Sequence, residues 1–353
     1  MANFAADQLL SSKTIKMTRQ PDYKFRKTNL FLCMALLLLT FGCGSHKEKT
    51  QNNDNQSIQI EKPAFSADSA LAYTEAQCAF GPRVPNSEAH KKCGNYLISF
   101  FQQYGDTVCI QSFDTKAFDG TTLHARNIIC SFNPQDRQRI VIASHWDSRP
   151  YADQDADENL HRNPIDGAND GAAGVGILME IARQLHLKNP DIGVDLICFD
   201  VEDYGPPQDR EYDSEGDWWC LGSQYWAKNP HTNQYRARYG ILLDMVGGEN
   251  ATFGKEGVSW HFAPDIVDKV WKNAQKLGYG ATFVQLQTPF VTDDHLYVNQ
   301  IAKIPMIDII EYDPASRSGF YKHWHTMNDK AENLSVTTLQ RVGEVILATL
   351  YSE

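Results

Sequence analysis

Apolar positions along the chain follow two spacings from about residue 66 to the C-terminus. Apolar residues three or four positions apart, the spacing of amphipathic helices, occur over five segments: Ser66–Ala79, Ser87–Tyr104, Gly171–Leu187, Pro264–Leu277 and Val336–Tyr351. Short apolar runs, which are typical of buried strands, form four segments: Arg139–Ser144, Val194–Phe199, Gly240–Met245 and Ile304–Ile310. Two more strand-like segments, Thr107–Phe113 and Ala125–Phe132, are expected to pair as an antiparallel edge.

The order of these elements predicts the fold class. Strands that alternate with helices favour an α/β domain with a mostly parallel central sheet and helices on both of its faces. The stretch from residue 65 to residue 353 has the length of one large domain, and we find no internal repeat or interior linker in it. We therefore predict a single domain over residues 65–353.

The first 42 residues have the pattern of a secretory signal peptide. A basic region containing Lys24, Arg26 and Lys27 precedes a run of twelve mainly apolar residues from Leu30 to Phe41. This run is shorter than the ~20 residues that a membrane-spanning helix needs, so it fits the apolar region of a signal. Met17 is an alternative start, because the residues from there onward already resemble a complete signal.

Cys43 directly follows the small residue Gly42, an arrangement that resembles the lipidation site of bacterial lipoproteins. The resemblance implies a lipid anchor at Cys43 and export to the bacterial cell envelope, facing the periplasm or the cell surface. A plain signal or anchor with an incidental cysteine is the alternative, because Thr40 stands where leucine is usual. Residues 43–64 are polar, which predicts a flexible tether.

Removal of residues 1–42 would leave a strongly acidic chain. These residues carry six of the 33 Lys and Arg and two of the 44 Asp and Glu, so 27 basic and 42 acidic residues remain, a net charge of −15. No basic cluster is left, which argues against nucleic acid as a partner. No cysteine pair has the CxxC spacing of a thiolate metal site, and we interpret Cys130 and Cys198 as small buried hydrophobic residues.

Five residues of the types that bind metal ions come in a set order along the chain: His145, Asp170, Asp203, Asp244 and His325. Three of them follow or close predicted buried strands, and open α/β sheets bind ligands outside the carboxyl ends of their strands. Zinc binds histidine nitrogen and carboxylate oxygen, and a catalytic zinc keeps one position open beside three protein ligands. The sequence therefore predicts a zinc site at this edge of the sheet, with either one ion or two.

Glu202 and Asp203 are adjacent acids that follow one predicted strand. Successive side chains point in different directions, so one carboxylate can bind metal while the other faces a substrate for proton transfer. A solvated turn is the alternative for an isolated acidic pair. The glycine-rich stretch GANDGAAGVG around Asp170 allows close backbone approach, either to the site or between helix and sheet.

The ordered segments HWD, GANDGA, FDVED, LLDM and WHT resemble the zinc exopeptidase-like fold that co-catalytic-zinc aminopeptidases share with animal-type glutaminyl cyclases. The resemblance extends over about residues 66–353. It implies that Asp170, Asp203 and His325 bind zinc and that Glu202 is the general acid/base. Asp203 stands where the family often has glutamate, which changes the reach of the carboxylate but not the type of ligand.

Two segments resemble the cyclases more than the aminopeptidases. Trp324, directly before His325, matches the tryptophan that shapes the cyclase substrate pocket, although an ordinary core aromatic is the alternative. The TDDH segment matches the one whose first aspartate, here Asp293, joins a hydrogen-bond network with the aspartate that matches Asp244. Asp308 is the expected third member, because a carboxylate inside an apolar strand needs a partner.

The resemblance therefore implies a glutaminyl-peptide cyclotransferase that uses one zinc ion. Its substrates would be peptides or proteins with N-terminal glutamine, which it converts to pyroglutamate with release of ammonia. Trp324, with Trp218 or Trp219, would form the walls of the substrate pocket. Asp244 and Asp293 would stabilise the reacting nitrogen.

The segment His145-Trp146-Asp147 supports a different activity. In two-zinc aminopeptidases the matching histidine completes a second metal site together with the residue that matches Asp244, whereas in the cyclases His145 would be a spectator. The alternative function is therefore an aminopeptidase that removes N-terminal residues. A non-enzymatic surface-binding lipoprotein is a third hypothesis, but it predicts eroded ligands, and the ligand set here is intact.

Overall fold

The computed structural model describes residues 62–209 and 216–353. The predicted signal peptide, the lipidation site at Cys43 and nearly all of the predicted tether lie outside the described residues. Six strands form the main sheet in the order β1-β2-β4-β3-β5-β8. Three of the five strand pairings are parallel, and helices lie on both sides, so the predicted fold class is confirmed.

One edge of the sheet is an antiparallel hairpin, as the apolar spacing predicts. β1 (Thr107–Lys116) pairs with β2 (Thr122–Phe132), and β2 runs antiparallel to β4 (Gly193–Phe199). The other neighbours in the sheet are parallel and include β3 (Arg139–His145), β5 (Tyr239–Asp244) and β8 (Met306–Ile310). Because β3, β4, β5 and β8 point the same way, their carboxyl ends meet at one edge of the sheet.

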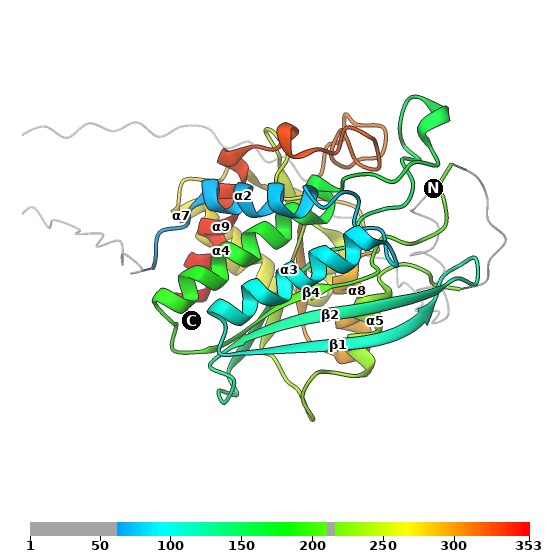
Figure 1. Cartoon of the computed structure of the whole chain (residues 1–353). Helices are drawn as coiled ribbons and strands as arrows, with labels where there is room; N and C mark the ends of the chain where they lie inside the picture. The colour runs from blue at the N-terminus through cyan, green and yellow to red at the C-terminus, as the bar shows by residue number, and fades with distance from the viewer. Residues whose placement is uncertain (1–61, 210–215) are drawn as a thin grey trace, which may run out of the picture. The chain divides into compact units, whose positions relative to one another are not determined.

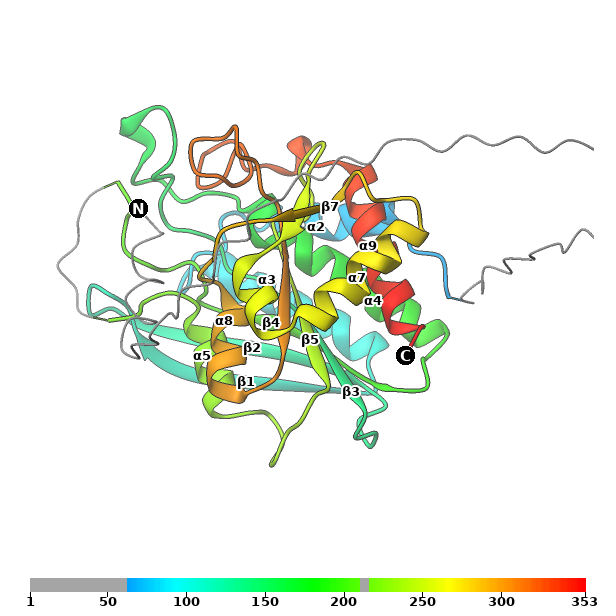
Figure 2. The same cartoon turned by 180° about the vertical axis from the view of Figure 1, so that it is seen from behind.

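The two faces of the sheet are covered by different sets of helices. On one side lie α2 (Ala67–Cys78), α3 (Glu88–Tyr104), α4 (Gly174–Leu187), α7 (Pro264–Lys276) and α9 (Val336–Leu350). On the other side lie α5 (Leu221–Lys228), α8 (Asp294–Tyr297) and a π-helical turn over Val298–Ala302. Figure 1 shows α3 and α4 in front of the sheet with α5 and α8 behind it, and Figure 2 gives the opposite view.

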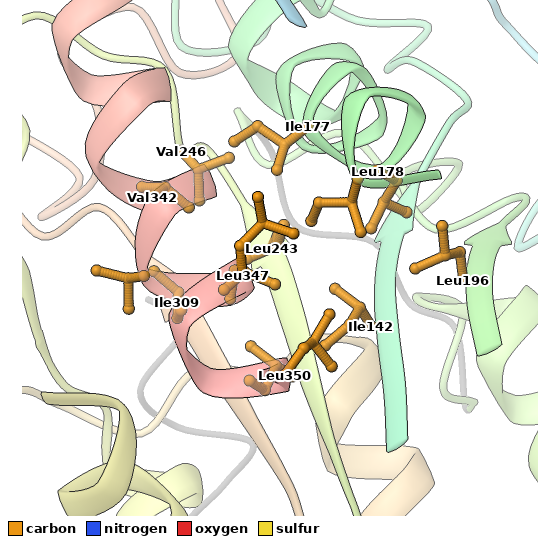
Figure 3. Packing of buried hydrophobic residues seen from close by; sticks show 14 of the residues in the cluster. Ile142, Ile177, Leu178, Leu196, Leu243, Val246, Ile309, Val342, Leu347 and Leu350 are labelled. Atoms are coloured by element: carbon orange, nitrogen blue, oxygen red, sulfur yellow. The ribbon is translucent and has the colours of Figure 1, made fainter. Parts of the chain in front are cut away.

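The larger hydrophobic core lies between the sheet and the α4 and α9 side. Alternate residues of the parallel strands point into it because side chains along a strand alternate between the two faces. Figure 3 shows strand residues packed against both helices: Ile142, Leu196, Leu243 and Ile309 against Ile177 and Leu178 of α4 and Val342, Leu347 and Leu350 of α9. The intervening strand residues, such as Val141 and Leu242, pack with Trp226 of α5 on the opposite face.

Several short elements are absent from the sequence-based prediction. They are α5, α8, α6 (Gly257–Phe262) and a two-stranded parallel sheet of β6 (Phe253–Lys255) and β7 (Phe283–Gln287). Each is too short for apolar spacing to reveal it. α4 also begins three residues later than predicted, because Asp170 has extended backbone angles, with φ −101° and ψ 87°.

The described cysteines are free thiols, and Cys130 and Cys198 are buried in β2 and β4, as predicted. Across the described ranges, none of the helices combines the length and apolar character needed to cross a membrane. The buried strands form the core, and polar residues follow them at the carboxyl edge of the sheet.

Candidate metal and catalytic site

The ends of three parallel strands bring the predicted ligands together. β3 ends at His145, β5 ends at Asp244, and the turn after β4 carries Glu202 and Asp203. His145 Nε2 lies 3.0 Å from Asp170 Oδ1 and 3.3 Å from Asp244 Oδ1. These side chains come from separate segments, so the register of the parallel sheet positions them.

Two groups of three ligands share Asp170. We call Asp170, Asp203 and His325 the His325 triad, and His145, Asp170 and Asp244 the His145 triad. In each triad the candidate ligand atoms lie within 4.8 Å of one another, and all three residues are buried. His325 Nε2 is 3.5 Å from Asp170 Oδ2 and 3.4 Å from Asp203 Oδ1.

Several ligand atoms of the triads have no hydrogen-bond partner. Within residues 62–209 and 216–353, the buried atoms Asp170 Oδ2, Asp203 Oδ2 and Asp244 Oδ1 have no hydrogen-bond partner. A buried polar atom without a partner costs about 1–3 kcal/mol, so such atoms are retained where something binds to them. Carboxylate oxygens and imidazole nitrogens at this spacing are the donors that zinc accepts.

The backbone at Asp170 is held in place by a residue far along the chain. Both carboxylate oxygens of the buried Asp329 accept backbone N–H groups, from Asn169 at 2.8 Å and from Asp170 at 3.1 Å. The peptide bond between Asp170 and Gly171 is cis. A Cβ on Gly171 would lie 2.5 Å from His145 Nε2, so only glycine allows this approach to the site.

A buried arginine supports the His325 triad from behind. Arg149 Nη1 donates to Asp203 Oδ1 at 3.2 Å, and its Nε and Nη2 donate to the two oxygens of Asp153 at 3.0 and 2.6 Å. Asp153 Oδ1 in turn lies 3.3 Å from His325 Nδ1, which leaves Nε2 on the side of the triad. Burial opposes the charge of Arg149, but the neighbouring Asp203 and Asp153 outweigh it and raise the pKa of the guanidinium.

The turn after β4 is fixed by Asp147, the second acid of the HWD segment. Its two oxygens accept the backbone N–H groups of Glu202 at 3.1 Å and Asp203 at 3.2 Å. Val201 has φ +52°, a conformation that β-branched residues rarely adopt. The Glu202 side chain is half-buried, and burial raises the pKa of its carboxyl well above the usual value, with the charges of Asp203 and Asp293 adding to the effect.

Asp244, Asp293 and Asp308 lie near one another beside the His145 triad. Burial raises the pKa of Asp308 well above its usual value, and the charges of Asp293 and Asp244 contribute further. Burial also raises the pKa of Asp244, to about 7, although the nearby His145 opposes the shift. His295 faces this group, with Nδ1 4.0 Å from Asp308 Oδ2. The three acids inferred from the sequence thus lie close together, but among the described residues Asp293 Oδ2 and both carboxylate oxygens of Asp308 have no hydrogen-bond partner, so the hydrogen-bond network itself stays a prediction.

The aromatic residues predicted for the pocket take different positions. The rings of Trp324 and His325 are stacked with their centroids 3.8 Å apart. The Arg149 guanidinium lies over the Trp219 ring, with the guanidinium carbon 4.8 Å from the ring centroid. Trp218 packs near Gly216, and among the described residues its indole N–H has no hydrogen-bond partner. Trp146 is fully buried and stacks on His90, so it serves the core.

Sequence reasoning missed the residues that hold the ligands. Arg149 and Asp153 both lie in the segment HWDSRPYAD, and Asp329 follows the WHT segment by three residues. Their nearness to the ligand segments was a usable signal. Their partners, however, come from distant loops, and no spacing pattern reveals which loop meets which.

The chain has a mixed, mostly parallel β-sheet covered by helices, with buried histidine and aspartate side chains at its carboxyl edge. This combination is typical of metalloenzymes with the exopeptidase-like fold. Residues 127–350 match the model of peptidase family M28, and the chain therefore belongs to this family. The resemblance inferred from the five ordered segments is confirmed. Family membership implies a metal-dependent enzyme.

Solved structures and curated relatives show which enzymes of the family this chain is similar to. A glutaminyl cyclase from Bacteroides thetaiotaomicron, bound to N-acetylhistamine, is 52% identical with a TM-score of 0.81, over 83% of this chain and 99% of that one. A leucine aminopeptidase precursor from Bacteroides thetaiotaomicron VPI-5482 is also 52% identical, with a TM-score of 0.80, over 82% of this chain and 98% of that one.

The glutaminyl-peptide cyclotransferase of Bos taurus is 27% identical in an alignment of 256 positions, which covers 62% of this chain and 64% of that protein. The chain thus spans slightly less than two thirds of the length of the curated cyclotransferases from Bos taurus and Bothrops jararaca.

Proposed function

We propose that this chain is a zinc-dependent glutaminyl-peptide cyclotransferase, which converts the N-terminal glutamine of peptides or proteins to pyroglutamate. The observation that carries the proposal is the stacking of Trp324 on His325, with centroids 3.8 Å apart. This stacking sets an aromatic wall against one of the three ligands of the His325 triad, where the flat side-chain amide of glutamine can lie. The similarity to glutaminyl cyclases supports the same activity.

The His325 triad fits a single catalytic zinc ion. It offers two carboxylates and one imidazole, and Asp170 Oδ2 and Asp203 Oδ2 lack hydrogen-bond partners. Three protein ligands leave one position for the substrate, the arrangement that catalytic zinc sites have. When bound there, Zn²⁺ would polarise the side-chain carbonyl of the substrate glutamine as a Lewis acid.

The chain's own residues would move the protons of the reaction. Glu202 accepts a proton from the α-amine of glutamine as this amine attacks the side-chain carbonyl carbon. The new carbon–nitrogen bond closes a five-membered ring, the bond to the side-chain nitrogen breaks, and Glu202 returns the proton to the departing ammonia. Asp244 and Asp293 accept hydrogen bonds from the reacting nitrogen of the substrate while this nitrogen carries positive charge. Ring closure within one residue needs little further positioning.

An aminopeptidase is the second candidate function, because the His145 triad is also assembled. A second metal ion on His145, Asp170 and Asp244 would give a two-metal hydrolase. The position of Trp324 against His325 favours the cyclase, because it places an aromatic wall beside the His325 triad.

The test is mass spectrometry of two peptides, one with N-terminal glutamine and one with N-terminal leucine, incubated with the full chain purified in detergent. We expect the glutamine peptide to lose only the mass of ammonia and the leucine peptide to stay intact. Loss of the first residue from either peptide would contradict the proposal and indicate an aminopeptidase. A chelator-treated sample is the control for spontaneous cyclisation.

We also propose that the enzyme is exported and held at the bacterial envelope through a lipid on Cys43. The sequence of residues 1–64 supports this proposal, and it would place the site where secreted proteins expose new N-termini. Cells fed labelled palmitate should incorporate the label into the wild-type chain but not into Cys43→Ala. Equal labelling of both chains would rule out the anchor.

A further inference from the structure

A buried cysteine lies against the carboxylate of Glu202. The Sγ of Cys220 is 3.2 Å from Glu202 Oε1, a distance at which a thiol donates a hydrogen bond. Among the described residues, no other side chain or backbone group hydrogen-bonds this carboxylate. Oε1 is thereby occupied, and Oε2 is the oxygen that stays free to exchange a proton with a substrate.

The backbone brings Cys220 to this position by two direct links. The Cys220 N–H donates to the Glu202 carbonyl at 2.9 Å, and the Leu221 N–H donates to the Val201 carbonyl at 3.1 Å. A Cβ on Gly222 would lie 2.1 Å from the Asp200 carbonyl oxygen, so only glycine lets the start of α5 come this close. The start of α5 and the turn after β4 therefore form one joined structure.

Cys220 also has a backbone conformation that a side chain makes unfavourable. Its φ is +55°, in the left-handed region that favours glycine or asparagine. Non-glycine residues persist in this region where the surrounding structure requires them, and such positions gather at active sites. Asparagine or glycine would fit the backbone better, so the thiol itself is the feature that the chain retains.

The thiol can serve as the donor of this contact. Burial raises the pKa of the Cys220 thiol well above its usual value, and the charge of Glu202 adds to the effect, so the S–H form is the one present. In that form Sγ donates to Glu202 Oε1 and orients the carboxylate.

We infer that Cys220 is a positioning residue for Glu202, whose thiol holds one carboxylate oxygen so that the other faces the substrate. The inference rests on the proposed function, in which Glu202 transfers the protons of cyclisation. Cys220 acts in this role only as a hydrogen-bond donor; because Glu202, Cys220 and Asp293 also lie within 4.8 Å of one another as candidate metal ligands, the test below includes the zinc content.

The first experiment compares Cys220→Ala and Cys220→Ser in the full chain, with a glutamine peptide as substrate. Loss of one hydrogen bond corresponds to about fivefold to tenfold in rate, so Cys220→Ala should lower kcat by that factor, with KM and zinc content within about twofold of wild type. Cys220→Ser should recover kcat to within about threefold, because a hydroxyl also donates. Unchanged kcat in Cys220→Ala, or a parallel loss of zinc, would overturn the inference.

A matched control separates positioning from packing. Cys130 is a buried thiol in β2 that does not contact Glu202. Cys130→Ala should lower the melting temperature and leave kcat unchanged. In a Glu202→Asp background, whose shorter carboxylate no longer reaches Cys220, the Cys220→Ala change should alter kcat by less than about twofold. Equal losses in both backgrounds would indicate a packing role.

Infrared spectroscopy tests the contact without relying on turnover or on a Cys220 variant that folds. The S–H stretch of a thiol bonded to a carboxylate lies at lower frequency than that of a free thiol, and Glu202→Ala should shift the Cys220 band upward. An unshifted band would contradict the hydrogen bond. If wild-type enzyme releases no ammonia from glutamine peptides, the proposed function fails, and the infrared band alone decides whether Cys220 holds Glu202.

Discussion

The His325 triad and the His145 triad share Asp170, but their surroundings differ in charge. Behind the His325 triad, the buried Arg149 brings positive charge to Asp203, and Asp153 faces His325 Nδ1. These contacts fix the direction of both side chains and balance the charge of the carboxylates. Such supporting contacts are typical of residues that bind a metal ion permanently.

The His145 triad also has an acid behind its histidine, with Asp147 Oδ1 3.6 Å from His145 Nδ1, but Asp293 and Asp308 rather than an arginine lie beside its Asp244. Burial, opposed by His145 and reinforced by the charges of Asp293 and Asp170, raises the pKa of Asp244 to about 7. Burial also raises the pKa of the Asp203 carboxyl in the His325 triad, so the two triads differ in the charges of their neighbours rather than in the direction of this shift. Two sets of similar residues can therefore serve different tasks, one as a metal site and the other in handling the reacting nitrogen.

Removal of the shared ligand should have the largest effect. Asp170→Ala takes a carboxylate from both triads, so we expect loss of bound zinc and at least about a thousandfold lower activity. Metal analysis of the purified variant together with ammonia release measures both. Asp209→Asn, which breaks an exposed ion pair with Arg162, is the control and should behave as wild type. Full zinc content in Asp170→Ala would show that neither triad binds the metal.

Glu202→Gln should separate proton transfer from metal binding. The amide cannot accept the proton of the α-amine, so kcat should fall by about 10²–10⁴-fold. Zinc content should stay at the wild-type value, because Glu202 lies outside the His325 triad that we propose to hold the ion, although it is close to Cys220 and Asp293 in a further group of candidate ligands. Stopped assays of ammonia release, with metal analysis of the same sample, measure both quantities. Near-normal turnover would remove Glu202 from the mechanism.

Two variants, each with one of the two histidines replaced, compare the triads directly. His325→Ala should lose its zinc, whereas His145→Ala should keep one zinc ion per chain and lose only about tenfold in kcat. The measurement is the zinc stoichiometry by native mass spectrometry. Two ions per chain in the wild type and one in His145→Ala would reverse the comparison and favour the aminopeptidase.

Loss of the support behind His325 should have the smallest effect. Asp153→Asn weakens the contact to His325 Nδ1 and the ion pair with Arg149, so zinc affinity should fall by about 10–100-fold. Competition with a chromophoric chelator measures this affinity. The Asp157 side chain lies in the same loop and accepts hydrogen bonds from Asn159, so the zinc affinity of Asp157→Asn should equal that of wild type. Equal affinities for both variants would show that Asp153 does not support the site.

Much of the sheet was predictable because each strand carries its own signal. The apolar runs that became β3, β4, β5 and β8 are buried along their lengths, and burial on both faces leaves a continuous apolar stretch in the sequence. The nearby ligand residues could also be anticipated, since polar residues at the ends of such runs gather at one edge. Short elements such as α5 and α8 have too few residues for a periodic pattern.

The sequence by itself determined the succession of the main strands and helices along the chain, the types of the ligands and their places after the strands. Only the tertiary structure decided which loops meet: Arg149 with Asp203, Asp329 with the backbone of Asp170, and Cys220 with Glu202. The physical reason is that burial of apolar residues repeats along a segment and can be read locally. A hydrogen bond between two loops depends instead on the register of the whole sheet, to which every strand contributes.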